Sequence, residues 1–155
     1  MDDPGQRGAV AEAAIAFEAT KLQVGVFRTQ TESRSDLIFD TGTRLLRVQC
    51  KSAARQGDVV VIRCGSCRRT RDGYVRRSYT REETDVVAAY CHDTGVSYLL
   101  EPNVFEGHLV LQLRLAPSKN NQRAGINWAA DFEFAARLAA LGAVAQLGER
   151  AAGSR

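Results

Sequence analysis

The sequence predicts an α+β domain in which helices flank the core of a mixed β-sheet. The expected elements run from one amphipathic helix through several strands to a second helix, without regular alternation of strand and helix. The strand segments are short, apolar and bounded by turn residues. A chain of 155 residues is long enough for one domain with its own core. We therefore expect a single domain over residues 1–141 and an unstructured C-terminal tail over residues 142–155.

The first helix is expected over residues 8–23. Alanine is abundant in this segment, and the larger apolar residues recur at helical spacing. The residues on this apolar stripe are Val10, Ala14, Phe17 and Leu22. Gly25 follows as a stop signal, so the helix is expected to end before it.

Two further helices are expected later in the chain. Residues 128–141 form the second substantial helix, with Trp128 on its apolar face. Thr80 and Glu83 have the spacing of a capping box, which predicts a short helix beginning at Arg81.

Strands account for most of the remaining regular structure. The expected segments are residues 24–27, 37–39, 45–48, 59–62, 74–79, 86–90, 96–100 and 109–115. Residues 59–62 are almost entirely β-branched and apolar, which favours a central strand. Residues 41–43 contain Gly42 and predict a hairpin turn between the second and third strands.

Composition argues against a membrane partner. The hydrophobic fraction is 45% and the charged fraction is 25%, as in ordinary globular domains. No apolar run reaches the roughly 18 residues of a membrane span, and the N-terminal residues lack the order of a signal peptide. We expect a cytoplasmic protein whose four cysteines are reduced.

Polar side chains accompany the predicted hairpin of residues 37–39 and 45–48. Asp36 lies near the start of one strand, and Gln49 and Lys51 lie near the end of the next. Residues i and i+2 of a strand share a face, so Gln49 and Lys51 point the same way and Asp36 can lie across from them. Two oxygen ligands and an ammonium group are the parts of a metal-dependent phosphodiesterase site. The alternative is that all three lie at solvent-exposed strand ends, and the motif alone favours neither.

Glu12 in the first helix adds a third oxygen ligand, and with it the sequence resembles the PD-(D/E)xK nucleases. The resemblance covers about residues 7–135 and is strongest to the branch associated with group I introns, with archaeal Holliday-junction resolvases as more distant relatives. It rests on Gly8 and Glu12, on Asp36 to Asp40, on Gln49-Cys50-Lys51, and on Asn120-Asn121-Gln122, Gly125-Ile126, Ala129 and Asp131-Phe132. It implies a restriction-endonuclease-like fold.

The resemblance also implies roles for these side chains. Asp36 would be the principal Mg²⁺ ligand, assisted by Glu12 and by the backbone carbonyl of Cys50; Mn²⁺ could substitute. Lys51 would orient or help to deprotonate the attacking water and offset charge on the phosphate. Gln49 takes a position that is usually Asp or Glu, which removes one negative charge, although its carbonyl oxygen can still bind a metal.

Asp40 is a further acid on the strand face that carries Asp36. It could assist the metal, but a cap on the turn at residues 41–42 is the favoured interpretation.

A basic segment follows the hairpin. Seven arginines and one acid lie between Arg63 and Arg81, interleaved with tyrosines, which indicates a surface that meets a polyanion. The residues expected to bind double-stranded DNA are Arg68, Arg69, Arg71, Arg76, Arg77, Asn120, Gln122 and Arg123. A solvated hairpin is the alternative for the arginines, and a helix cap is an equal alternative for the last three residues.

Cys64 and Cys67 have half of a zinc-site spacing, and Cys91 with His92 could complete it. Ordinary reduced cysteines are favoured, because this spacing matches no known zinc module. A zinc-stabilised interaction domain therefore stays a minor alternative.

The function indicated is Mg²⁺-dependent hydrolysis of DNA by a site-specific, homing-type endonuclease. A homo-oligomer, dimer or tetramer, is expected because two DNA strands require two active sites. A Holliday-junction-resolvase-like nuclease and a catalytically inactive DNA-binding module of the same fold are the alternatives. One permitted coding string for residues 142–150 resembles the start of a bacterial transfer-RNA gene, which fits a mobile element and a tail that is incidental to folding.

Overall fold

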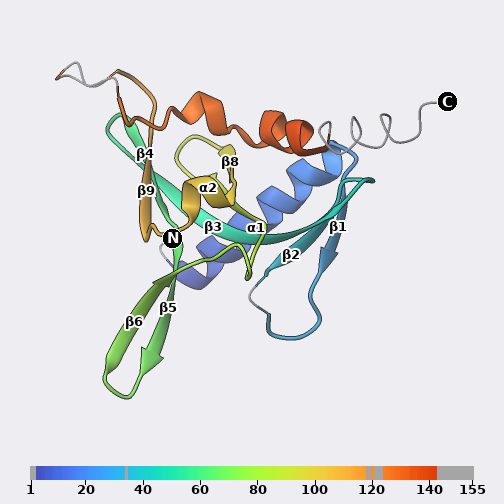
Figure 1. Cartoon of the computed structure of the whole chain (residues 1–155), viewed down its shortest axis with the longest axis horizontal. Helices are drawn as coiled ribbons and strands as arrows, with labels where there is room; N and C mark the ends of the chain where they lie inside the picture. Colours follow the sequence, from blue (N-terminus) through green and yellow to red (C-terminus); the bar gives the residue numbers. More distant parts are fainter. Residues whose placement is uncertain (1–2, 34, 118–119, 121–123, 143–155) are drawn as a thin grey trace.

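The structure is a computed structural model that describes residues 3–33, 35–117, 120 and 124–142. Apart from Gly142, the expected tail lies outside these residues, as do Gln122 and Arg123. A large mixed β-sheet with helices beside it forms the body of the molecule, and a separate two-stranded sheet projects from that body (Figure 1). The predicted α+β class is confirmed.

Within the described residues the large sheet has seven strands, and its longest strand, β3, organises it. The strands are β1 (Gly25–Arg28), β2 (Leu37–Asp40), β3 (Leu45–Gln56), β4 (Val59–Arg63), β7 (Val86–Cys91), β8 (Val96–Leu100) and β9 (Val110–Arg114). The first residues of β3 pair antiparallel with β2 and its last residues pair antiparallel with β4. Its middle pairs in parallel with β7, which makes the sheet mixed. β4 lies between β3 and β9, so its predicted central place is confirmed.

Helix α1 (Pro4–Lys21) begins earlier than the apolar pattern predicted. The Asp3 side chain accepts a hydrogen bond from the Gly5 backbone N–H at 3.0 Å, and Pro4 occupies the first turn, where its missing N–H costs nothing.

The buried face of α1 differs from the predicted stripe. Ala11, Ile15 and Ala19 are buried, whereas Val10 and Phe17 are 45% and 64% exposed. Two of the three buried residues are alanines, whose small side chains let the helix axis lie close to the sheet. The position of the small residues, rather than that of the largest apolar ones, therefore decides which face packs.

The predicted helix over residues 128–141 is interrupted. Only Ala129–Phe132 form a short 3-10 turn (η1), and a helix resumes at residues 134–142. Trp128 and Glu133 are extended because each makes an isolated bridge to a strand residue, Arg114 and Tyr98 respectively. Pairing with the sheet thus overrides the helical pattern.

Two other short elements lie between the strands. Pro102–Phe105 forms the single helical turn α2. The expected helix at Arg81 is only a turn, in which the Thr80 hydroxyl contacts the Glu83 carboxylate at 3.2 Å. A helix does not continue because Thr84, one residue after Glu83, is buried, and its hydroxyl is within hydrogen-bond distance of the Arg47 carbonyl in β3 and the Val86 carbonyl in β7.

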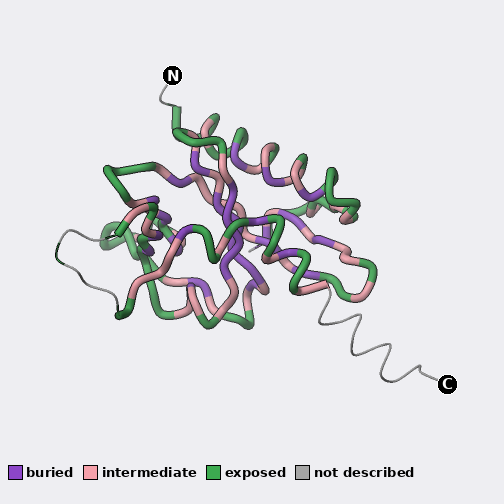
Figure 2. The backbone as a smooth tube through the Cα atoms, turned by 90° about the horizontal axis from the view of Figure 1, so that it is seen from above, coloured by how far each residue is buried: buried purple, intermediate pink, exposed green. Residues whose placement is uncertain are grey.

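The core has two clusters on opposite faces of the sheet. β7 contributes Val86 and Ala88 to one cluster and Val87 and Ala89 to the other. Figure 2 shows the buried positions gathered along the strands in the middle of the molecule and on one side of α1. In the described part of the chain, no helix is long and apolar enough to cross a membrane.

The projecting hairpin consists of β5 (Gly65–Thr70) and β6 (Gly73–Ser78) and makes up the smaller sheet. Of its two strands only β6 was expected from the sequence. Figure 1 shows this hairpin extending away from the large sheet, with its turn far from the core. The hairpin therefore exposes both faces over much of its length, and its side chains are available to a partner.

Candidate active site

Asp36, Gln49 and the Cys50 backbone meet where β2 begins. The Asp36 backbone N–H donates to the Val48 carbonyl at 2.9 Å and extends the β2–β3 pairing by one residue. One carboxylate oxygen of Asp36, Oδ2, accepts hydrogen bonds from Gln49 Nε2 and from the Cys50 backbone N–H, each at 2.8 Å. The hairpin register thus places Asp36 across from Gln49, as the strand pattern indicated.

The same contacts leave oxygen atoms for a further ligand. Both hydrogen bonds to Asp36 end on Oδ2, and among the described residues Oδ1 accepts none. Gln49 uses its amide nitrogen for this contact, so its carbonyl oxygen is the end of the side chain that stays available. An ionised carboxylate in place of Gln49 could not donate to Asp36 at all.

Glu12 reaches this region from α1. Its carboxylate forms an ion pair with Arg28 of β1. Glu12, Arg28 and Asp36 line one cavity together with a loop; the loop residues are Thr29, Thr31, Glu32, Ser33 and Ser35. Burial, followed by the negative charges of Asp36 and Glu12, raises the pKa of the Cys50 thiol, whereas Arg28 opposes this shift. The carboxylates of Glu12 and Asp36 therefore line the same cavity and lie close enough to Cys50 to raise the pKa of its thiol.

Lys51 shares the strand face of Gln49 but reaches the base of the projecting hairpin. Its Nζ donates to the Gly65 carbonyl at 3.2 Å and lies 5.1 Å from the centroid of the Tyr79 ring. Burial raises the pKa of the neighbouring Cys64 thiol to about 12, an effect that the Lys51 charge partly offsets. In the described part of the chain Lys51 makes no ion pair with a carboxylate, so its charge is available to a phosphate.

A cleft separates the hairpin from the loop that carries Ser33. It is lined by Ser33, Gln49, Ser66, Arg68, Val75, Arg77 and Tyr79. All five arginines predicted to bind DNA on the hairpin are exposed: Arg68, Arg69, Arg71, Arg76 and Arg77. Of these, only Arg68 and Arg77 line the cleft, and Arg77 forms an ion pair with Glu83 at 2.6 Å.

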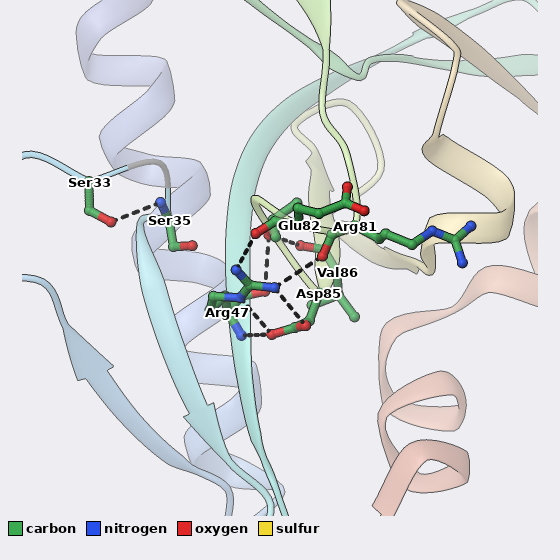
Figure 3. A network of polar contacts seen from close by, with 8 residues as sticks. Ser33, Ser35, Arg47, Arg81, Glu82, Asp85 and Val86 are labelled. Atoms are coloured by element: carbon green, nitrogen blue, oxygen red, sulfur yellow. Dashed lines mark hydrogen bonds and ion pairs between the residues drawn. The ribbon is translucent and has the colours of Figure 1, made fainter.

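A polar network fixes the segment that returns from the hairpin to β7 (Figure 3). The Arg47 guanidinium contacts the Asp85 carboxylate and the backbone oxygens of Arg81 and Glu82. The Arg47 backbone N–H also donates to Asp85 at 2.7 Å. Arg47 precedes Gln49 by two residues on β3, so the network ties the hairpin segment to the strand that carries the site.

The remaining predicted side chains lie elsewhere. Asp40 accepts a hydrogen bond from the Gly42 backbone N–H at 2.8 Å, so its predicted role as a turn cap is confirmed. Asn120 is exposed. Cys64 and Cys91 are buried in the core, whereas Cys67 is exposed on β5.

The described residues contain no group of three His, Cys, Asp or Glu side chains suited to a metal ion. The Asp36 site falls outside that definition because its third oxygen comes from the Gln49 amide.

Sequence reasoning missed two contributors to the site. Arg28 pairs with Glu12 across 16 residues of sequence, and no local pattern joins a helix to a strand in this way. Tyr79 was noted only among interleaved aromatic residues, yet its ring lies beside Lys51. Its burial in an otherwise exposed arginine-rich segment is a tertiary property without a local sequence signal.

A family model described as PD-(D/E)XK endonuclease matches residues 3–135. The chain belongs to this endonuclease family.

Among solved structures, the bacterial homing endonuclease I-Ssp6803I is similar, with a TM-score of 0.70 and 24% identity over 99% of both chains. This likeness shows that the two proteins share their fold. No curated protein matches the chain.

Proposed function

We propose that the chain is a Mg²⁺-dependent endonuclease that hydrolyses DNA phosphodiester bonds, with Mn²⁺ able to substitute. Members of the PD-(D/E)XK family generally use divalent metal ions. The observation that carries the proposal is the contact between Asp36 and Gln49, with the Lys51 ammonium group on the next position of the same strand face; among the described residues that group has no carboxylate partner. Two oxygens and a cation on neighbouring strands are what hydrolysis of a phosphodiester needs.

The donor set fits a hard divalent cation. Asp36 Oδ1 and the Gln49 carbonyl oxygen are not used in the contact between these two side chains, and Glu12 opens onto the same cavity as Asp36. Mg²⁺ prefers oxygen ligands and retains several waters, so it does not need a closed protein cage. Asp36, Gln49, Glu12 and the Cys50 carbonyl would hold it. When bound, the ion supplies Lewis acidity and a more acidic water.

Lys51 has a separate task. Its two partners, a backbone carbonyl and an aromatic ring, orient the ammonium group without neutralising it. A cation held in this way stabilises negative charge that develops on the phosphate and positions the attacking water. Arg68 lines the cleft that Gln49 also lines, so it is placed to contact DNA held there.

Plasmid cleavage tests the chemistry. We expect nicking or linearisation with Mg²⁺, none in EDTA, none with Asp36→Ala, and a loss of at least roughly 100-fold with Lys51→Ala. Asp40→Asn is the matched control, because Asp40 is an acid on the same strand face that caps a turn instead. Salt-sensitive DNA binding without cleavage in Mg²⁺ or Mn²⁺ would instead identify an inactive binding module.

We further propose that cleavage is site-specific and of the homing type, by a dimer or tetramer. The resemblance to the intron-associated branch supports this, and the fold is that of a protein described as a homing endonuclease. Sequencing the ends produced from a genomic fragment library, with transfer-RNA genes included, should return one dominant site. Preferential cutting of four-way junctions regardless of sequence would favour a resolvase.

A further inference from the structure

The strand register divides the hairpin side chains between two faces. Arg68 pairs with Val75 and Ser66 with Arg77, and directly paired residues project to the same side. Arg69 pairs with Tyr74 and Cys67 with Arg76, and these four project to the other side. Two neighbouring arginines, Arg68 and Arg69, therefore belong to opposite faces, which we name the cleft face and the outer face.

Only the cleft face borders the candidate active site. Ser66, Arg68, Val75 and Arg77 line the same cleft as Gln49. On the outer face, Cys67 and Arg76 line a second pocket with Arg63, the last residue of β4, and Leu109, which precedes β9; Ser66, at the hairpin base, lines both pockets. A DNA strand whose phosphate lies at Asp36 and Gln49 thus has the cleft face, and not the outer face, turned toward it.

The base of the hairpin is clamped to the large sheet. The Cys64 backbone N–H donates to the Leu109 carbonyl at 2.8 Å. Gly65 packs closely against Leu109 and Arg77: a Cβ added to it would lie 2.8 Å from the Leu109 side chain and 3.1 Å from the Arg77 carbonyl oxygen. Lys51 adds its hydrogen bond to Gly65. The direction of the hairpin relative to the active site is therefore fixed, which a reading element requires.

The chemistry of the cleft face suits base edges in the major groove. A two-stranded β-ribbon fits this groove, where arginine binds guanine O6 and N7 with both arms of its fork and an apolar side chain contacts the thymine methyl group. Arg68 is exposed beside Val75, an apolar side chain that is 52% exposed. Arg77 is held by Glu83 near the base of the hairpin, which leaves Arg68 and Val75 as the reading pair.

We propose that Arg68 and Val75 on the cleft face read base edges of double-stranded DNA, whereas Arg69 and Arg76 on the outer face supply sequence-independent attraction. This inference rests on the proposed function as a DNA endonuclease. It assigns sequence preference to the cleft face of the hairpin. Exposure alone does not distinguish the five arginines of the hairpin, because all five are exposed.

Binding selection from a randomised duplex library tests the assignment, with Ca²⁺ in place of Mg²⁺ so that binding is read without cleavage. Arg68→Ala should reduce discrimination at one guanine position by roughly 5- to 100-fold, the range for a two-pronged arginine–guanine contact. Arg68→Lys should relax the same position while leaving the salt dependence of binding unchanged, because it keeps the charge but loses the fork. Val75→Ala should weaken preference at an adjacent thymine.

Arg69→Ala is the matched control, one residue away on the same strand. It should weaken binding to all sequences alike and lower the salt slope by about one, with the selected sequence unchanged. A shift of preference by Arg69→Ala equal to that by Arg68→Ala, an unchanged preference in Arg68→Ala and Arg68→Lys, or no preference in the unmodified protein would each overturn the inference. Cleavage is measured separately in Mg²⁺, so a protein that selects a sequence but never cuts contradicts only the proposed catalytic function.

Discussion

In the proposed metal site, Gln49 is an uncharged side chain that contacts the carboxylate of Asp36. Its amide nitrogen donates to Asp36 at 2.8 Å, so the ligand oxygens are placed by a hydrogen bond before any cation arrives. Two carboxylates in the same positions would repel each other until a cation came between them. The Gln49 amide therefore lacks the negative charge of a carboxylate, but its hydrogen bond orders the Asp36 side chain in the metal-free protein.

The hydrogen bond from Gln49 to Asp36 predicts how the variant Gln49→Glu should behave. In EDTA we expect the variant to be less stable by about 1–2 kcal/mol, since a hydrogen bond to a charged group is replaced by repulsion. For a chain of this size that corresponds to roughly 2–8 °C in the unfolding midpoint. Saturating Mg²⁺ should raise the midpoint of the variant more than that of the unmodified protein, because a second carboxylate binds the cation more tightly.

Thermal unfolding in EDTA and in Mg²⁺ measures this difference. Gln112→Glu, the same substitution at an exposed position of β9, is the control and should show neither effect. Equal midpoints for Gln49→Glu and the unmodified protein in EDTA would show that the contact with Asp36 does not order the site.

Among the elements, β3 carries most of the architecture that the site needs. Its twelve residues present Arg47, Gln49 and Lys51 in succession on one face. Arg47 binds the segment that returns from the hairpin, Gln49 binds Asp36, and Lys51 binds the hairpin base. A single strand therefore sets the relative positions of three parts of the chain.

The Arg47 network gives a pH prediction at this scale. Burial alone would raise the pKa of Asp85, but the hydrogen bonds and charge of Arg47 outweigh it and hold that pKa below its ordinary value. A depressed carboxyl pKa stabilises the fold above the unfolded value of roughly 4, and the contribution disappears as pH falls through the folded value. Asp85→Asn should therefore cost about 1–2 kcal/mol at neutral pH, and this cost should decrease as pH falls below the unfolded value and through the folded pKa of Asp85.

Urea unfolding at several pH values measures that difference. Asp58→Asn, in the exposed turn between β3 and β4, is the control and should change little at any pH. A cost of Asp85→Asn that stays constant through the whole acid range in which the protein still folds would show that the charge of Asp85 contributes nothing through Arg47.

At the scale of the whole molecule, we expect the large sheet and its helices to fold without the projecting hairpin. Neither core cluster includes a residue of β5 or β6, although Cys64 and Tyr79 on either side of the hairpin are buried. Replacing residues 66–77 with Asn-Gly should therefore leave the unfolding midpoint within a few degrees of that of the intact protein.

The same deletion removes Arg68, Arg69, Arg71, Arg76 and Arg77. Arg68 is assigned to base edges and Arg77 is paired with Glu83, so three arginines remain to neutralise phosphates. The slope of log affinity against log salt should therefore decrease by about three. Calorimetry and binding at several salt concentrations measure the two outcomes. An unfolded deletion variant, or an unchanged salt slope, would contradict the separation of roles.

The sequence predicted the features that depend on residues close together in the chain, and it did not predict those that depend on how distant elements pack. The turn after Asp40 and the strand alternation were enough to place Asp36 across from Gln49. The face of α1 was wrong, because the two alanines that pack closest to the sheet carry little signal in a hydrophobic pattern. The contact of Lys51 with Gly65 was not foreseen either, since it depends on how the hairpin leaves the sheet.

That contact between Lys51 and the Gly65 carbonyl couples the position of the lysine to the position of the hairpin base. The acceptor belongs to the first residue of the hairpin, so any displacement of the hairpin base also moves the partner of the ammonium group. By linkage, whatever stabilises one position of Lys51 stabilises the corresponding position of the hairpin, and by the same amount. If Lys51 acts on the phosphate as proposed, a duplex that displaces the hairpin base also displaces this lysine, and selection among sequences would extend from binding to the rate of cutting.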